Sequence, residues 1–113
     1  MKQFVFYFTA VAGVTLSCTN NDDDASVTCG SQTISYSTTV APIITSSCAT
    51  TTSCHGTGSS RGPGALTSYS AVFANRSSIK TAVANGSMPE NGKLTSDQKN
   101  SIICWIENGA PNN

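Results

Sequence analysis

The five cysteines constrain the fold of this chain more than any other feature. They are Cys18, Cys29, Cys48, Cys54 and Cys104. From Cys18 onward the sequence is rich in Ser, Thr, Asn and Gly, and large apolar side chains are few. A domain this small and polar buries too little apolar surface to be stable without a staple. The way in which the cysteines are used therefore decides what the chain can fold into.

Residues 1–17 have the layout of a secretory signal peptide. A lysine at position 2 precedes an apolar run from Phe4 to Leu16, which is too short to be a good membrane-spanning helix. The sequence TLSC at 15–18 resembles the lipobox of bacterial lipoproteins, in which the cysteine is lipidated. We therefore expect export and lipidation of Cys18. The lipid would anchor the protein to a bacterial membrane, the outer one being favoured, on its periplasmic or cell-surface side. The alternative is an ordinary signal peptide cut near Ser17.

The remainder of the chain divides into a tether and one domain. Residues 18–28 hold three consecutive aspartates and almost no apolar side chain, which predicts a lipidated, disordered tether. Residues 29–113 then form the single domain that a chain of 113 residues allows. The chain has six basic and six acidic side chains and no basic patch, so we expect no nucleic-acid binding. Export also places the cysteines in an oxidising compartment, where disulfides persist.

Apolar residues recur at helical spacing in four segments of the domain. Three of them are 39–48, 68–75 and 78–84, and the fourth follows Thr95. Thr95 and Gln98 form a capping box at its start, and Gly109 is a stop signal at its end. No alternating pattern long enough for a sheet follows the signal peptide. The sequence therefore predicts an all-α fold of three to four short helices and long loops.

Other helix boundaries follow from single capping residues. Ser37 or Thr39 is expected to cap the first helix, with Pro42 in its first turn, where the missing N–H costs little. This helix would end at Cys48. Ser77 is expected to cap the third helix, and the glycine at position 86 would end it in a left-handed conformation.

Residues 47–56, SCATTTSCHG, point to a cofactor. Cys54-His55-Gly56 is how a c-type haem attachment site ends, but the first cysteine of that motif usually lies three residues before the second. Here Cys48 lies six before Cys54. The residues fit three alternatives: a haem site with a stretched loop, a Cys48–Cys54 disulfide beside an incidental histidine, or part of a metal site. A zinc site would be one ligand short. His55 is the only histidine, and Met88 is the only methionine after the signal. Haem iron in electron-transfer proteins often has one histidine and one methionine as its ligands.

Over residues 36–113 the chain resembles small class I-like cytochrome c domains of exported bacterial lipoproteins. The resemblance rests on a first helix that leads into a cysteine, on Cys54-His55-Gly56, and on LTSY at 66–69, GSMP at 86–89 and the segment from LT at 94–95 to WIENGAP at 105–111. It implies a cytochrome c-like fold around one covalent haem c, with the last helix packed across the first. It also implies that His55 and Met88 bind the iron, while Cys48 and Cys54 form thioethers with the haem.

The resemblance further implies a function. With His55 and Met88 both on the iron, no position is open for a substrate, so we expect a carrier of single electrons between redox partners in the cell envelope and no enzymatic activity. In this family a proline after the motif offers its carbonyl to the histidine ring, a role that falls on Pro63. Two alternatives stay open. One is a disulfide-stabilised binding lipoprotein without a cofactor, and the other is a haem-based ligand sensor in which Met88 is labile.

If Cys18 is lipidated and Cys48 and Cys54 are bonded to haem, Cys29 and Cys104 remain. We expect a disulfide between them that ties the start of the domain to the last helix. Closing such a long loop contributes about 4 kcal/mol by the chain-entropy estimate. The alternative, two buried free thiols, is disfavoured in an oxidising compartment.

Overall fold

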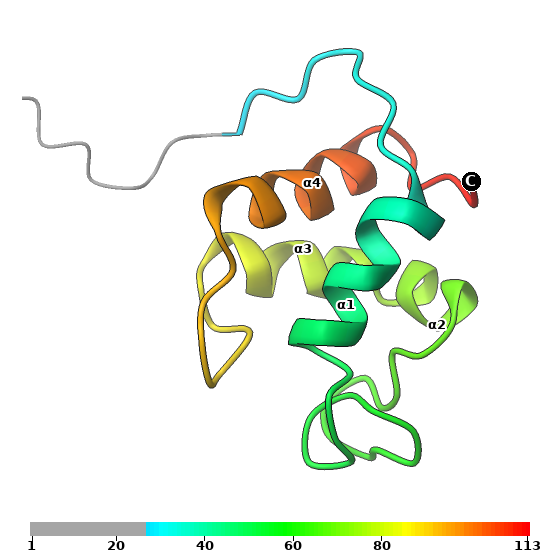
Figure 1. Ribbon diagram of the computed structural model, residues 1–113, viewed down its shortest axis with the longest axis vertical. Helices are drawn as coiled ribbons and strands as arrows, with labels where there is room; N and C mark the ends of the chain where they lie inside the picture. The colour runs from blue at the N-terminus through cyan, green and yellow to red at the C-terminus, as the bar shows by residue number, and fades with distance from the viewer. Residues whose placement is uncertain (1–26) are drawn as a thin grey trace, which may run out of the picture.

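The computed structural model describes residues 27–113, which fold into an all-α domain (Figure 1). The helices are η1 (Tyr36–Val40), α1 (Ala41–Ser47), α2 (Tyr69–Ala74), α3 (Arg76–Ala84) and α4 (Ser96–Glu107). Residues 27–113 contain no strand, and none of their helices is long and apolar enough to cross a membrane. The all-α class expected from the sequence is confirmed. The signal peptide, Cys18 and most of the tether lie outside the described residues.

The first helical run begins earlier than the sequence predicts. It starts at Tyr36 with η1, one turn of π-helix, and the hydroxyl of Ser35 before it accepts a hydrogen bond from the Thr38 N–H at 3.3 Å. The expected start near residue 39, with Ser37 or Thr39 as the cap, is therefore wrong. Ser35 is a cap of the same chemical kind, but it lies two residues before Ser37 and four before Thr39.

The π-helical turn has a physical reason in Pro42. Proline has no N–H to donate, and its ring crowds the carbonyl four residues earlier in a regular helix. The wider π-turn lies directly before α1 and accommodates Pro42 in the first turn of that helix. α1 then ends at Ser47, and Cys48 is its C-cap, where the sequence places it.

α2 and α3 meet at Asn75, which ends one helix and begins the next. The Asn75 carbonyl accepts the N–H of Ile79 at 2.9 Å, so α3 is already helical at Arg76. The prediction that Ser77 caps α3 is therefore wrong, because Ser77 lies inside the helix. Gly86 has a φ of 75° just after α3, which is the left-handed stop that the sequence predicts.

α4 has the boundaries that its capping signals predict. The Gln98 N–H donates to the Thr95 hydroxyl at 3.2 Å, and the Thr95 N–H donates to the Gln98 side-chain oxygen at 2.9 Å. Asn108 is the C-cap, and Gly109 follows it with a φ of 97°. The capping box is confirmed, and α4 is the longest helix in the described part of the chain.

Trp105 of α4 lies at the centre of the core. The other fully buried large side chains are Val40, Ile44, Val72, Val83 and Ile102. The Trp105 ring centroid lies 5.3 Å from that of Tyr36, so the last helix packs against the first helical run, as the resemblance implies. The indole N–H of Trp105 donates to the Pro111 carbonyl at 3.0 Å, and the Tyr69 hydroxyl donates to the Ala110 carbonyl at 2.8 Å. These bonds satisfy polar atoms that burial would otherwise leave unpaired.

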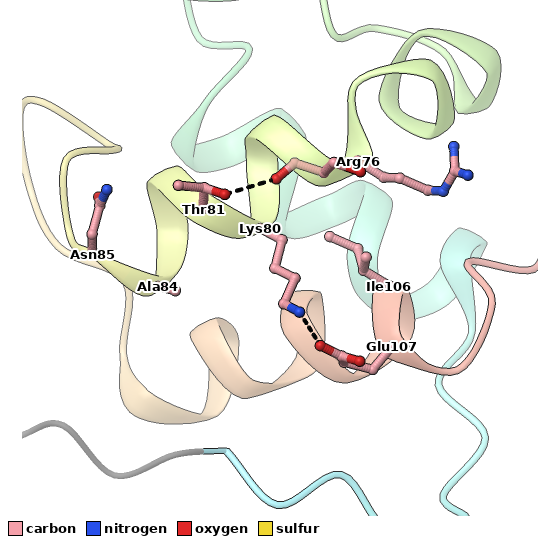
Figure 2. A pocket seen from close by; sticks show the side chains of 8 residues that line it. Arg76, Lys80, Thr81, Ala84, Asn85, Ile106 and Glu107 are labelled. Carbon is pink, nitrogen blue, oxygen red and sulfur yellow. Dashed lines mark hydrogen bonds and ion pairs between the residues drawn. The ribbon is translucent and has the colours of Figure 1, made fainter.

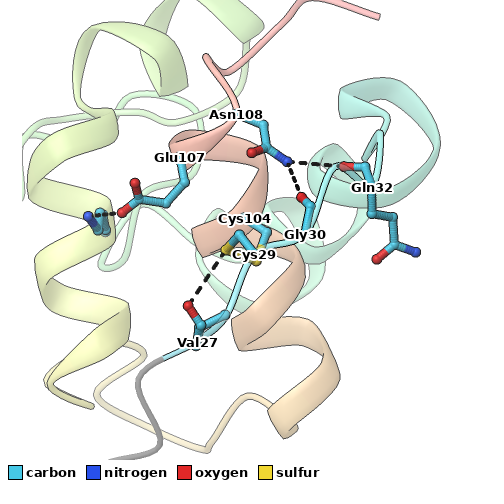
Figure 3. Close-up of a disulfide and its surroundings, with 8 residues drawn as sticks. Val27, Cys29, Gly30, Gln32, Cys104, Glu107 and Asn108 are labelled. Atoms are coloured by element: carbon cyan, nitrogen blue, oxygen red, sulfur yellow. Dashed lines mark hydrogen bonds and ion pairs between the residues drawn. A yellow bond between two sulfur atoms is a disulfide. The ribbon is translucent and has the colours of Figure 1, made fainter.

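A disulfide fastens the segment before η1 to α4 (Figure 3). Cys29 and Cys104, the pair expected from the sequence, are joined with their Cα atoms 5.2 Å apart. Asn108 adds two hydrogen bonds from its amide nitrogen, to the carbonyls of Gly30 at 3.4 Å and Gln32 at 3.1 Å. The N-terminal segment therefore lies along the end of the last helix.

Candidate functional site

The loop after α1 brings three of the predicted site residues together. The His55 N–H donates to the Cys48 carbonyl at 3.0 Å, which closes the stretch between the two cysteines into a ring. Inside it, the Thr51 carbonyl accepts the N–H groups of Cys54 at 3.1 Å and Gly56 at 2.8 Å. The five residues between the cysteines thus form a closed turn, and the stretched spacing is accommodated locally.

Gly56 is required by the close approach of Thr51. A Cβ added at Gly56 would lie 2.8 Å from the backbone carbon and oxygen of Thr51, closer than real Cβ contacts come. The contact is with backbone atoms, so no side chain can move aside to relieve it. The glycine of the Cys54-His55-Gly56 tripeptide therefore has a packing role in this turn.

His55 is buried, with 9% of its surface exposed, and its ring is oriented by a hydrogen bond. Nδ1 lies 3.0 Å from the Gly64 carbonyl oxygen, which can only accept, so Nδ1 carries the proton and donates. Pro63, whose carbonyl the resemblance implies as the acceptor, is not the partner, because the loop turns so that the carbonyl of Gly64 faces the ring. The Leu66 N–H also donates to the His55 carbonyl at 2.8 Å, which holds the same loop against the histidine backbone.

The second ring nitrogen of His55, Nε2, has no hydrogen-bond partner among residues 27–113. In that part of the chain no buried side-chain nitrogen or oxygen lacks a partner. Nε2 therefore reaches the molecular surface, and with the proton on Nδ1 its lone pair is free to bind a metal. One nitrogen held by a carbonyl and the other left for the metal is the usual arrangement of metal-binding histidines.

Cys48 and Cys54 are both free thiols in the structure, with different surroundings. Burial, and secondarily the nearby Cys54, raise the pKa of Cys48. The Thr50 and Thr51 hydroxyls lower the pKa of Cys54, which is half-exposed. The two thiols are not joined in a disulfide, so each sulfur is chemically able to form a new bond.

Met88, the second predicted iron ligand, lies in the loop between α3 and α4. Its N–H donates to the Ala82 carbonyl at 3.2 Å, and its side chain is half-buried. Two residues further on, Glu90 lies 3.9 Å from Arg61, which belongs to the loop that follows His55. The Met88 loop and the His55 loop are therefore neighbours, although both partners of the ion pair are exposed and it contributes little by itself.

A shallow hollow of about 740 Å³ lies elsewhere, between α3 and α4 (Figure 2). Lys80 of α3 contacts Glu107 of α4 across it, and Arg76 lies near its edge. The hollow is not predictable from the sequence, because charges at single helix positions do not show which helices lie side by side. No group of three or more His, Cys, Asp or Glu side chains in residues 27–113 could hold a metal ion, a finding that does not bear on an iron held by one histidine and one methionine.

Comparison of the chain with protein-family models, with curated proteins and with solved structures finds no match.

Proposed function

We propose that this protein is a lipid-anchored c-type cytochrome with one haem, which carries single electrons between redox partners at the cell envelope. The environment of His55 carries the proposal. Its imidazole is buried, Nδ1 donates to the Gly64 carbonyl, and Nε2 has no partner among residues 27–113. A histidine held in this way is prepared to bind a metal through Nε2.

Haem supplies a one-electron couple between ferric and ferrous iron when it is bound. The Gly64 carbonyl would hold His55 in one tautomer and one ring orientation and would make Nε2 a better electron donor. Met88 would give its sulfur from the loop between α3 and α4. A thioether favours ferrous iron and raises the reduction potential relative to a harder ligand. With both residues bound to iron, no position is open to a substrate, which favours electron transfer over catalysis.

Cys48 and Cys54 would attach the haem covalently. The S–H group of each cysteine would add across one vinyl C=C bond of the haem, with the sulfur bonded to one carbon and the hydrogen to the other. Both thiols are free, and the Thr51 turn closes the stretch between them. Lengthening this loop costs little, since each doubling of loop length adds only about 0.6 kcal/mol. The spacing is therefore no physical obstacle to two thioethers.

The first prediction is that the haem is covalent. When the chain is expressed with a c-type maturation system, its pyridine haemochrome spectrum should be that of haem c. Acid–acetone should fail to extract the haem, and the intact mass should exceed that of the polypeptide by one haem. Replacing both Cys48 and Cys54 by alanine should abolish covalent retention, and Ser53→Ala is the control that should not. Absence of haem, or complete extraction, would contradict the proposal.

Cys48→Ala separates one thioether from two. If Cys48 is the first attachment point, the variant should hold its haem by Cys54 alone, and the haemochrome band should shift toward that of a haem with one remaining vinyl group. An unchanged band would mean that Cys48 is not attached, which revises the site without removing the haem.

A haem-based ligand sensor is the second candidate, favoured by the half-buried side chain of Met88 and the exposed ion pair that joins its loop to the His55 loop. Carbon monoxide distinguishes the two functions in the reduced, haem-loaded protein. Slow binding that becomes fast in Met88→Ala supports electron transfer with Met88 bound at rest. Fast binding in the unaltered protein supports the sensor.

A binding lipoprotein without a cofactor is the third candidate, and the hollow between α3 and α4 is the observation in its favour. The haemochrome test distinguishes this candidate from the other two. A binding lipoprotein without a cofactor would contain no haem even when it is expressed with a c-type maturation system.

A further inference from the structure

The chain contains three Asn-Gly pairs in three different structural settings. They begin at Asn85, Asn91 and Asn108. Asn-Gly is prone to lose its side-chain amide, because glycine has no side chain to hinder attack by its own nitrogen. We propose that Asn91 is the site at which the folded protein deamidates spontaneously, which creates a carboxylate in the loop that carries Met88. The proposal does not depend on haem.

The reaction requires a free backbone N–H and a free side-chain amide. The Gly92 nitrogen gives its proton to water and attacks Cγ of Asn91. A C–N bond forms, Nδ2 takes up a proton from water, the bond from Cγ to Nδ2 breaks, and ammonia departs to leave a cyclic succinimide. Water then opens the ring at either carbonyl to give aspartate or isoaspartate. One water is consumed and one ammonia is released, with no oxidation or reduction.

Asn85 is restrained in both of these groups. The Gly86 N–H donates to the Val83 carbonyl at 3.4 Å in the last turn of α3. The side-chain oxygen of Asn85 accepts the Ser87 N–H at 2.9 Å. The attacking nitrogen and the amide under attack are therefore both engaged, and the helix end must open before the ring can form.

Asn108 is restrained more strongly, at the end of α4 (Figure 3). The Gly109 N–H donates to the Ile106 carbonyl at 3.1 Å. The leaving amide nitrogen of Asn108 donates to the carbonyls of Gly30 and Gln32, in the segment that the disulfide fastens to α4. Three hydrogen bonds must break before reaction.

Asn91 has none of these restraints. Asn91 and Gly92 are both exposed, and neither makes a hydrogen bond to any residue in the described part of the chain. A Cβ placed at Gly92 would meet no atom within 4 Å, and the same holds at Gly86 and Gly109, so the three pairs differ in their hydrogen bonds and not in the space around the glycine. The neighbouring Glu90 faces Arg61, and a second carboxylate one residue away would add negative charge beside that contact.

The test follows deamidation of the protein as isolated, incubated in mildly alkaline buffer, by peptide mass mapping and by isoaspartate methyltransferase labelling. Each hydrogen bond that must break is expected to slow the reaction roughly fivefold. Asn91 should therefore deamidate on the order of tenfold or more faster than Asn85 and Asn108. Asn91→Gln should remove most of the isoaspartate label.

The control is the same chain, reduced and unfolded in denaturant, in which the three pairs should react at similar rates because their local sequences are alike. The proposal is overturned if Asn85 or Asn108 reacts as fast as Asn91 in the folded protein. It is equally overturned if the order of rates is the same in the unfolded chain, because local sequence and not structure would then set the selectivity.

Discussion

At the scale of single residues, two thiols in one turn have opposite environments. Cys48 is buried, so its thiolate is desolvated and its pKa lies above the ordinary value. Cys54 is half-exposed, and the Thr50 and Thr51 hydroxyls stabilise its thiolate and bring its pKa below the ordinary value. At any pH near neutrality, more of Cys54 than of Cys48 is ionised.

We therefore predict that Cys54 is alkylated before Cys48 in the haem-free folded protein. The thiolate is the nucleophile, so the rate of reaction with iodoacetamide should rise with pH to a midpoint that is lower for Cys54 and higher for Cys48. A pH series followed by peptide mass mapping measures both midpoints. Thr51→Val should raise the Cys54 midpoint and leave that of Cys48 nearly unchanged. Equal rates for the two thiols across the series would refute the assignment.

At the scale of elements, η1 is held at its start by a residue from the far end of the sequence. The Tyr36 N–H donates to the side-chain oxygen of Asn113 at 2.8 Å, and the Ser37 N–H donates to the Asn113 carbonyl at 2.9 Å. The first N–H groups of a helix have no partner within it. The Ser35 hydroxyl accepts only the Thr38 N–H. Asn113 therefore supplies the acceptors for the N–H groups of Tyr36 and Ser37.

Asn113→Ala should lower the free energy of unfolding by about 1 kcal/mol, the usual effect of removing a helix cap. Asn112→Ala is the matched control, because Asn112 is exposed and its side chain bonds to no residue in the range 27–113, and it should change stability by less than about 0.5 kcal/mol. Urea unfolding measures both through the midpoint, with the slope unchanged. Indistinguishable midpoints for the two variants would mean that the Asn113 contact adds nothing.

At the scale of the whole molecule, the disulfide joins residues 75 positions apart and so encloses most of the domain. The core that it encloses is small, and its largest fully buried side chains are a tryptophan and aliphatic residues. A cross-link over this length restricts the unfolded chain strongly. It therefore compensates for the limited apolar burial of a domain of this size.

Replacing both Cys29 and Cys104 by serine should lower the free energy of unfolding by about 4 kcal/mol according to the chain-entropy estimate. Reductant should destabilise the unaltered protein by a similar amount and should leave the double variant unaffected. Urea unfolding with and without reductant measures this, and non-reducing peptide mapping should recover the two cysteines in one fragment. Equal stability of the unaltered protein in both conditions would show that the bridge does not stabilise the fold.

The sequence by itself determined the features that rest on neighbours within a few positions. The all-α class, the capping box of Thr95 and Gln98, the left-handed Gly86 and the helix end at Gly109 all follow from patterns within a few turns of chain. The Cys29–Cys104 pair was also predictable, but only after the resemblance had assigned the other cysteines. The start of α3 was not predictable. Asn75 begins α3 directly where α2 ends, so Ser77, although a good capping residue, lies inside the helix.

Tertiary structure alone decided which partner each exposed or loop residue meets. Gly64 rather than Pro63 faces His55, because glycines at 62 and 64 adopt left-handed conformations that the sequence permits without specifying. Asn113 reaches η1 only because α4 packs across it. Similarly, the Asn108 side chain has hydrogen-bond partners that Asn91 lacks, because the disulfide places the segment with Gly30 and Gln32 beside it. The contacts of Asn113 and Asn108 form where distant segments come together, and the relative placement of those segments depends on the packing of the core and not on any local propensity.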